Sequence, residues 1–251
     1  MQAEIKGTVM PVLEFLLNPG EAVVTPHGEL SWMSPNVQMS QTVSGGGGGG
    51  FMKNLKRVVG GGGLFMTQYQ ATGSGTAMIS FAAKQPGHIM PVDVSPERPM
   101  IVHRHGWMAS TPGVSASVAF QKTFTRSLFG GEGFILQRLD GNGRAWVELS
   151  GELSTYDLQP GQQMLVHPGH IGMFDASVSF TMTTVPGIKN KVFGGDGLFL
   201  VVLSGPGKIY LQSMPLPNLA HSIAPYMPEA EGESRGGTSV AGGIIGGLLK
   251  G

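Results

Sequence analysis

Two histidine segments are the residues of this chain whose types and spacing could bind a metal ion. His103-Arg104-His105 places two imidazoles two residues apart, and a strand would direct both side chains to the same face. His167 follows a similar apolar run later in the chain, in MLVH compared with MIVH. Imidazole nitrogens ligate zinc and other transition metals, so these residues could hold a catalytic metal.

The complete ligand set of such a site is not present in the sequence. In cupins, which are β-barrels, a His-x-His pair is followed closely by a glutamate and later by another histidine. Here the residues after His105 read GWMASTPGVSASVAF, without a carboxylate. We therefore predict neither a metal nor any other cofactor. A cupin-like metal-binding enzyme that uses His103, His105 and His167 is kept as an alternative.

Clusters of cationic residues offer a different chemistry, the binding of anions. Each cluster precedes a glycine-rich motif, and together they comprise Lys53, Lys56 and Arg57, then Lys122 and Arg126, then Lys189 and Lys191. Cations presented together could contact phospholipid headgroups, polyphosphate or a nucleic-acid backbone. The alternative interpretation is that lysine and arginine are ordinary residues of exposed loops.

Motifs of nucleophilic or phosphate chemistry are missing. The chain has no cysteine, no Gly-x-Ser-x-Gly elbow and no Gly-Lys-Ser/Thr. Glu132 and Asp196 lie within glycine motifs where the first copy has glycine, which indicates turn residues rather than catalytic acids. We predict no catalytic residue, no identifiable small-molecule ligand and a protein that is not an enzyme.

Composition favours a turn-rich β protein. The 251 residues are 41% hydrophobic and 13% charged, with a net charge of zero, and they include 41 glycines and 17 prolines. Such a chain can bury a large core, and its turn residues favour many short strands over long helices. Because the charges balance, a global field does not attract nucleic acid, and this argues against RNA binding.

Three copies of one unit must position these residues. The motif GGGGLF at Gly60 returns as GGEGFI at Gly130 and as GGDGLF at Gly194, each time followed by an apolar run. A Gly-x-Gly comes next, then the strand-like segments TAMISF, RAWVEL and KIYLQS. We expect each Gly-x-Gly to close a β-hairpin, because glycine readily adopts the positive φ of tight turns.

The repeats define the predicted fold. They comprise about residues 16–92, 93–156 and 157–216, and each begins near a proline-centred turn. One unit cannot bury its apolar face alone, so we expect the three to pack around a common axis as one closed all-β domain, residues 1–222, of antiparallel strands and hairpins. The Gly-rich remainder, residues 223–251, is predicted to be a flexible tail.

Three successive signatures resemble the altered-inheritance-of-mitochondria family, a mitochondrial biogenesis family with prokaryotic members. They read GGFMKNLKRVVGGGGLFMTQYQATGSG, GGEGFILQRLDGNGRAWVELSG and KNKVFGGDGLFLVVLSGPGKIYLQSMPLPNLA. The resemblance implies a fold similar to that of the tryptophan RNA-binding attenuator protein, of the double-stranded β-helix or β-sandwich type. It supplies no catalytic residue, and its mitochondrial role transfers to this chain only as an analogy.

These observations favour a non-enzymatic binding or scaffold protein, oligomeric and peripheral to a membrane through its basic loops. Its partners would be further copies of itself and an anionic membrane surface or another polyanion. RNA binding on the attenuator-protein pattern is the other alternative. The opening MQAEIKGTVM lacks the apolar core of a secretory signal, so we expect a cytoplasmic location, with contact at the membrane surface.

Overall fold

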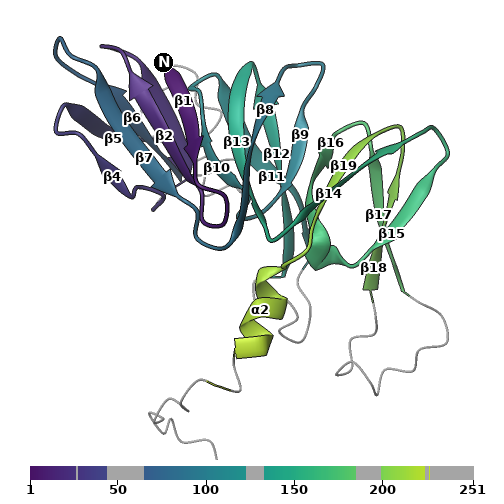
Figure 1. Cartoon of the computed structure of the whole chain (residues 1–251). Helices are drawn as coiled ribbons and strands as arrows, with labels where there is room; N and C mark the ends of the chain where they lie inside the picture. The colour runs from purple at the N-terminus through teal and green to yellow at the C-terminus, as the bar shows by residue number, and fades with distance from the viewer. Residues whose placement is uncertain (27, 44–64, 123–132, 185–198, 224–225, 227–251) are drawn as a thin grey trace, which may run out of the picture. The chain divides into compact units, whose positions relative to one another are not determined.

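Eighteen strands in three successive sets of six form the main part of the molecule (Figure 1). The computed structural model describes residues 1–26, 28–43, 65–122, 133–184, 199–223 and 226. The first repeat comprises β2 (Val12–Leu17), β3 (Ala22–Pro26), β4 (Trp32–Met33), β5 (Val37–Val43), β6 (Phe65–Ala71) and β7 (Ala77–Ala82). The second comprises β8 (Gly87–Val94), β9 (Met100–His103), β10 (Trp107–Ser110), β11 (Val114–Lys122), β12 (Phe134–Gly141) and β13 (Gly143–Ser150). The third comprises β14 (Leu153–Leu158), β15 (Gln163–Val166), β16 (Ile171–Asp175), β17 (Ser179–Thr184), β18 (Phe199–Ser204) and β19 (Gly207–Gln212).

The three repeats have the same strand pairing. If the six strands of a repeat are lettered a to f, then f pairs with a and c, and e pairs with b and d, always antiparallel. Each repeat is therefore two half-sheets, a-f-c and d-e-b. The prediction of an all-β fold built from three related antiparallel units is confirmed.

Neighbouring repeats share sheets. Strand b of one repeat pairs with strand c of the next, at Val24↔Ser110 between β3 and β10 and at Ile101↔Phe174 between β9 and β16. The result is four sheets: sheet I (β1-β2-β7-β4), sheet II (β5-β6-β3-β10-β13-β8), sheet III (β11-β12-β9-β16-β19-β14) and sheet IV (β15-β18-β17). The extra strand β1 (Gln2–Lys6) pairs with β2 at the margin of sheet I.

Three apolar cores separate the four sheets. The first core lies between sheets I and II, the second between sheets II and III, and the third between sheets III and IV. Side chains alternate across a strand, so Val23 of β3 belongs to the first core and its neighbour Val24 to the second. Sheets II and III are consequently buried on both faces.

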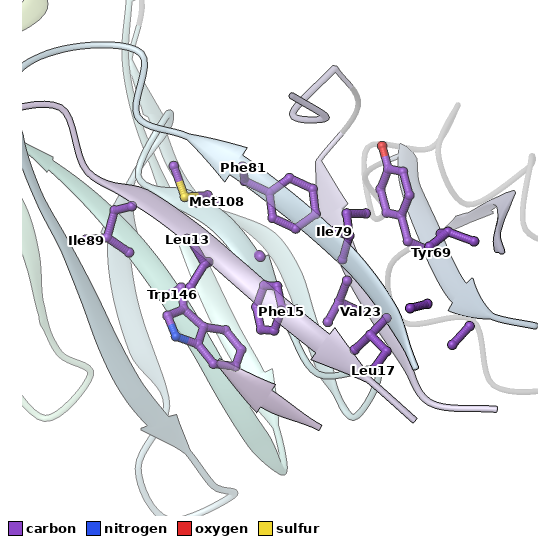
Figure 2. Close-up of a cluster of buried hydrophobic side chains, with 14 residues drawn as sticks. Leu13, Phe15, Leu17, Val23, Tyr69, Ile79, Phe81, Ile89, Met108 and Trp146 are labelled. Carbon is purple, nitrogen blue, oxygen red and sulfur yellow. The ribbon is translucent and has the colours of Figure 1, made fainter. Parts of the chain in front are cut away.

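Aromatic side chains fill the first core and connect the first two repeats (Figure 2). Phe15 and Phe81 come from sheet I, and Trp146 comes from sheet II. The ring centroids of Phe15 and Trp146 are 4.7 Å apart at an interplanar angle of 88°, an edge-to-face contact. The first two repeats therefore pack directly against each other through side chains of the first core.

The Gly-x-Gly segments are corners between sheets, which corrects the expected hairpins. The strands that they connect lie in different sheets: β6 in II and β7 in I, β12 in III and β13 in II, β18 in IV and β19 in III. Gly141 has φ +109°, and a Cβ there would lie 2.1 Å from the carbonyl oxygen of Gly113. A corner this tight excludes a side chain. Within the repeats, the consecutive strands that do pair antiparallel in one sheet are the d-e pairs β5-β6, β11-β12 and β17-β18.

Proline-centred turns carry strand a into strand b in every repeat. The backbone N–H groups of Glu21, Arg98 and Gln162 each donate to the carbonyl oxygen three residues earlier, that of Asn18, Ser95 and Gln159 respectively. Strand a precedes this turn, so the six-strand repeats begin at Val12, Gly87 and Leu153. These starts lie a few residues before the starts that were predicted from sequence similarity.

The array of repeats is open, and the expectation of closure around a common axis is wrong. Strand β4 lies at one edge of sheet I, and β15 lies at one edge of sheet IV. Among the described residues they pair only with β7 and β18, whereas the corresponding strands within the array each have two partners. Pairing of strand b with strand c of the next repeat thus occurs twice within the array. Among the described strands, β4 and β15 at its two ends lack this pairing.

A short helix follows the last strand. Helix α2 (Leu216–Ile223) has the sequence LPNLAHSI and lies at the end of the expected β domain, where no helix was predicted. Contacts divide the chain into a unit of Met1–Leu219 and a unit of Ala220–Gly251. Across the described ranges, the structure contains no helix of the length and apolarity needed to cross a bilayer.

Candidate functional site

The predicted anion-binding residues belong to the segments that join strands d and e of each hairpin. Lys53, Lys56 and Arg57 fall between β5 and β6, Arg126 between β11 and β12, and Lys189 and Lys191 between β17 and β18. All of these lie outside the described residues. Lys122 is the last residue of β11, where its backbone pairs with Phe134. The strands on either side show that the basic segments occupy the same topological position in all three repeats.

His103 is a half-buried residue whose ring connects two sheets. Its Nε2 lies 3.0 Å from the carbonyl oxygen of Glu148, so β9 in sheet III contacts β13 in sheet II. Burial lowers the pKa of His103 to about 4, although the bond to Glu148 opposes the shift. The ring is therefore neutral at pH 7, and its Nε2 must carry the hydrogen because a carbonyl can only accept. That nitrogen is unsuited to ligating a metal.

The other two histidines of the metal hypothesis have separate surroundings. His105 lies in the turn between β9 and β10, and His167 immediately precedes the 3-10 helix η1 (Pro168–His170). Burial lowers the pKa of His167, with a smaller effect from His170, whose ring centroid is 5.9 Å away. His170 Nδ1 in turn lies 2.8 Å from the carbonyl oxygen of Gln212. Within the part of the chain that the structure describes, three or more potential ligands do not gather in a metal-binding group.

Two carboxylates with raised pKa values form a cluster that sequence reasoning missed. Glu148 is buried in β13, where its Oε1 accepts the backbone N–H of Lys84 at 2.8 Å. The Lys84 ammonium forms an ion pair with Glu29. Burial raises the pKa of both carboxyl groups, and the nearby Glu29 charge adds to the shift at Glu148. Both carboxylates have bonded partners, and Glu148 fixes the chain just after β7.

No sequence signal points to this cluster. Glu148 stands within the strand-like segment RAWVEL, where alternation alone does not distinguish a buried glutamate from an exposed one. Raised carboxyl pKa values are typical of general acids, but they also occur in structural networks. Here the backbone amide of Lys84 and the carbonyl of Glu148 itself are both engaged in contacts between strands. The arrangement supports a structural role.

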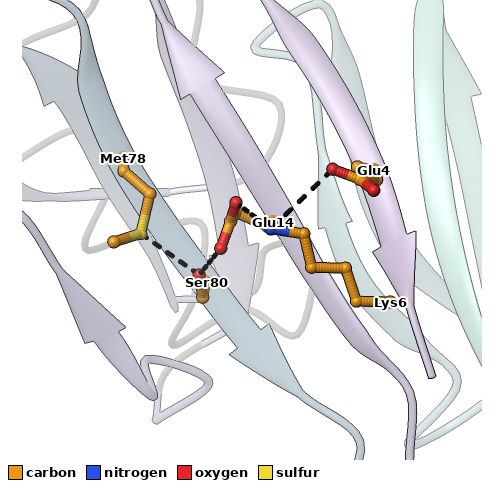
Figure 3. Close-up of polar contacts among 5 residues, drawn as sticks. All are labelled: Glu4, Lys6, Glu14, Met78 and Ser80. Carbon is orange, nitrogen blue, oxygen red and sulfur yellow. Dashed lines mark hydrogen bonds and ion pairs between the residues drawn. The ribbon is translucent and has the colours of Figure 1, made fainter.

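The outer face of sheet I carries a polar network (Figure 3). Lys6 Nζ lies 2.5 Å from Glu14 Oε1 and 3.8 Å from Glu4 Oε2, and Ser80 Oγ donates to Glu14 Oε2 at 3.3 Å. The Glu14 carboxylate raises the pKa of the Lys6 ammonium. Three charges joined in this way, across β1, β2 and β7, keep this margin of the sheet hydrated.

A surface hollow lies beside the first proline turn. It has a volume of about 440 Å³ and is lined by residues that include Met1, Glu21, Gln68 and Gln70. The Met1 ammonium lies 2.5 Å from Glu21, and with the N–H of Asn18 it lowers the pKa of the Glu21 carboxyl. The charged groups at its floor are paired with each other, so the hollow has no charge directed to a ligand.

The chain is similar to a protein family and to proteins of known sequence or structure. The profile of the mitochondrial biogenesis AIM24 family matches residues 3–214, which include all three repeats. An uncharacterized protein of Streptococcus pyogenes serotype M6 is 22% identical over 222 residues, or 87% of each chain. The crystal structure of a Streptococcus pyogenes protein matches with a TM-score of 0.70 at 20% identity, over 90% of this chain and 99% of the other. At this identity, the structural likeness shows the fold alone.

Proposed function

Because the chain belongs to the mitochondrial biogenesis AIM24 family, whose profile covers every repeat, we propose that it is a non-enzymatic binding protein that contacts anionic surfaces through its basic segments. The observation that supports this function is the repeated placement of those segments. In each repeat they connect strands d and e of a paired hairpin. Three attachment points on one folded unit bind a surface more tightly than any one of them alone.

The contacts of the histidines and carboxylates also favour a binding protein over an enzyme. His103 donates to a backbone carbonyl, and Glu148 accepts a backbone amide. These groups, which could otherwise act as acid or base, stabilise contacts between strands. The described glycine motifs form corners whose positive φ angles serve the fold. The chemistry that is left for function lies in the cationic segments.

The ligand that fits this arrangement is a membrane surface rich in anionic lipid. Each lysine or arginine near such a surface contributes roughly 1 kcal/mol of attraction. A net charge of zero means that binding depends on the local clusters. The association should therefore weaken steeply as salt is added, because the charges involved are exposed. Cytoplasmic location with contact at the membrane surface remains part of this proposal.

Co-sedimentation with vesicles of phosphatidylserine and phosphatidylcholine tests the proposal. Reversal of Lys53, Lys56 and Arg57 to glutamate should lower binding at least about 10-fold. A control with the same charge change at Arg98, Arg144 and Lys208, which lie on strands or turns outside the basic segments, should bind as the unmodified protein does. Equal binding by both triple variants, or none by the unmodified protein, would overturn the proposal.

Competing anions identify the source of the attraction. Vesicles of phosphatidylcholine alone should not bind, and free polyphosphate should compete only at high concentration if a surface is the ligand. Displacement by low concentrations of polyphosphate would instead identify a soluble polyanion. A salt-dependent mobility shift with RNA, without vesicle binding, would replace the membrane proposal by the RNA alternative.

A further inference from the structure

The strand pairing that joins the repeats has an incomplete half at each end of the array. Sheets II and III each combine a d-e-b half-sheet with the c-f-a half-sheet of the next repeat. Sheet IV is a d-e-b half alone, ending at β15, and sheet I is a c-f-a half with β1 added, ending at β4. Sheet IV therefore lacks a c-f-a half-sheet, and sheet I lacks a d-e-b half-sheet, so each has what the other lacks.

The side chain at the centre of the open β15 edge is exposed where its counterparts are buried. Leu165 pairs with Val202 as Ile101 pairs with Arg138, so it holds the place that Ile101 holds in β9 and Val24 in β3. The exposed fraction is 2% for Val24, 8% for Ile101 and 57% for Leu165. The difference follows from the missing neighbour, since the first two residues each face a strand c.

The third core also lacks the contribution that the other cores receive from the following repeat. Trp146 of the second repeat enters the first core, and Tyr210 of the third repeat packs against the second core. Met164, Phe180 and Met182 at the third core are only partly buried. In the first repeat the equivalent residue is Ser80, which pairs with Trp32 of strand c as Trp146 pairs with Ala109 and Tyr210 with Met173, so a large side chain is replaced by a small one on the outer face of sheet I.

Exposed apolar side chains on sheet I, at the other end of the array, are suited to fill the incomplete third core. Trp32 of β4 stands opposite Ser80 on the same outer face and is 47% exposed. Leu16 of β2 pairs with Met78 and is 41% exposed. The charged network of Lys6, Glu14 and Glu4 lies farther from the β4 edge, toward β1 (Figure 3). An apolar strip next to the open edge thus borders a polar margin.

We propose that β15 of one copy pairs antiparallel with β4 of a second copy, so that sheet IV and sheet I of the two molecules form one continuous sheet. The interface repeats, between chains, the junction that β3-β10 and β9-β16 form within the chain. Trp32, Met78 and Leu16 of the second copy complete the third core of the first. Such a contact joins unlike surfaces, so the association continues head to tail.

Met33 holds the place in β4 that Ser110 holds in β10 and Phe174 in β16. The pair Met33↔Ile79 corresponds to Ser110↔Ala145 and Phe174↔Ile209, because Ile79, Ala145 and Ile209 each pair with the third-last residue of strand a. Ser110 and Phe174 are the residues that meet strand b of the preceding repeat. Met33 of the second copy therefore faces Leu165 in the proposed junction. Strand β4 has only two residues, so the junction is short, and the association is accordingly reversible and depends on concentration.

Analytical ultracentrifugation of the full chain across a concentration series, without lipid, tests this junction. Leu165→Lys places a charge at the edge and should weaken association at least about 10-fold. Val118→Lys, a change at a strand residue that is 42% exposed in β11, is the matched control and should associate as the unmodified protein does. A monomer at every concentration, or equal association by Leu165→Lys and the unmodified protein, would overturn the proposal.

Cross-linking identifies the partner surface. The chain has no cysteine, so Leu165→Cys and Met33→Cys, at the two residues that face each other in the proposed junction, each introduce a single thiol. A mixture of the two variants should form a disulfide-linked dimer that neither variant forms alone. If Leu165→Cys cross-links to itself, two β15 edges pair with each other and the head-to-tail arrangement is wrong. The junction specifies a partner for the scaffold role proposed above, and it is measured without vesicles, so failure of one proposal is distinguishable from failure of the other.

Discussion

The imidazole Nε2 of His103 donates to the carbonyl oxygen of Glu148 across 3.0 Å, and this bond connects sheets III and II through the second repeat. The contact is enclosed: a Cβ on Gly106 would lie 2.7 Å from the His103 ring. The neutral imidazole is thus held between the two sheets. Its titration must therefore influence stability.

Acid should destabilise the protein through His103. Its pKa is about 4 in the folded protein, below the ordinary value of 6.5, because burial disfavours the charged ring. The unfolded chain thus binds a proton that the folded chain does not, and the free energy of unfolding falls as the pH is lowered from 6.5 toward 4. His103→Gln keeps a donor and removes the titration, so it should reduce this slope by about one proton.

Urea unfolding at several pH values measures the slope. The buried carboxyls Glu29 and Glu148 have raised pKa values and act in the opposite direction, but both are retained in His103→Gln and cancel in the comparison. His88→Gln, at a histidine side chain that is 44% exposed, is the control. A slope unchanged by His103→Gln would contradict the assignment.

The glycine corners should differ in their tolerance of a methyl group. Gly73 and Gly141 begin the Gly-x-Gly segments of the first two repeats, with φ +76° and +109°. A Cβ on Gly73 meets nothing within 4 Å, whereas one on Gly141 lies 2.1 Å from the Gly113 carbonyl oxygen. Gly73→Ala should cost about 1–2 kcal/mol, the cost of positive φ. Gly141→Ala should cost at least about 3 kcal/mol, because backbone must move. Equal losses in thermal unfolding would show that the corner is not tight.

Removal of the Phe15 ring should weaken the packing between the first two repeats. Phe15 is fully buried and touches the rings of Phe81 and Trp146. Phe15→Ala should lower the free energy of unfolding by about 3–5 kcal/mol. Leu16→Ala, at the next residue with its side chain on the opposite face, should cost much less because that side chain is 41% exposed. Chemical denaturation compares the two, and similar losses would contradict the core assignment.

Tryptophan fluorescence should separate one exposed ring from two buried ones. Trp107 and Trp146 are 1% and 3% exposed, and Trp32 is 47% exposed. Iodide should quench one component of the emission at low protein concentration, and Trp32→Phe should abolish that component. Persistence of quenching in Trp32→Phe would show that another tryptophan is accessible.

Repetition was readable in the sequence because the tight corners depend on glycine. The motifs at Gly60, Gly130 and Gly194, with the Gly-x-Gly that follows, mark strands e and f of each unit. The tryptophans show what the repetition does not reveal, because Trp107 and Trp146 are buried whereas Trp32 is exposed. The reason is positional, since Trp32 lies on the outer face of sheet I, against which the described strands place no further sheet.

The candidate site was less accessible to sequence reasoning. His103 and His167 lie at equivalent positions at the ends of strands b, as the sequence comparison indicates, but their spacing does not reveal that His103 contacts Glu148, 45 residues away. The carboxylate cluster of Glu29 and Glu148 has no local signature at all. The basic residues from Lys53 to Lys191 remain predictions, supported by the topological equivalence of their segments.

By itself, the sequence determined the all-β class, the threefold repetition and the positions of the turns, because glycine, proline and strand periodicity act over a few residues. Only the tertiary structure decided which strands are partners. Local rules join e to f as a hairpin, but a tight corner sends them to different sheets, and pairing of b with the next c depends on contacts between distant residues. That same long-range pairing left Leu165 and Trp32 exposed at the two ends of an open array, which nothing in their immediate sequence predicts.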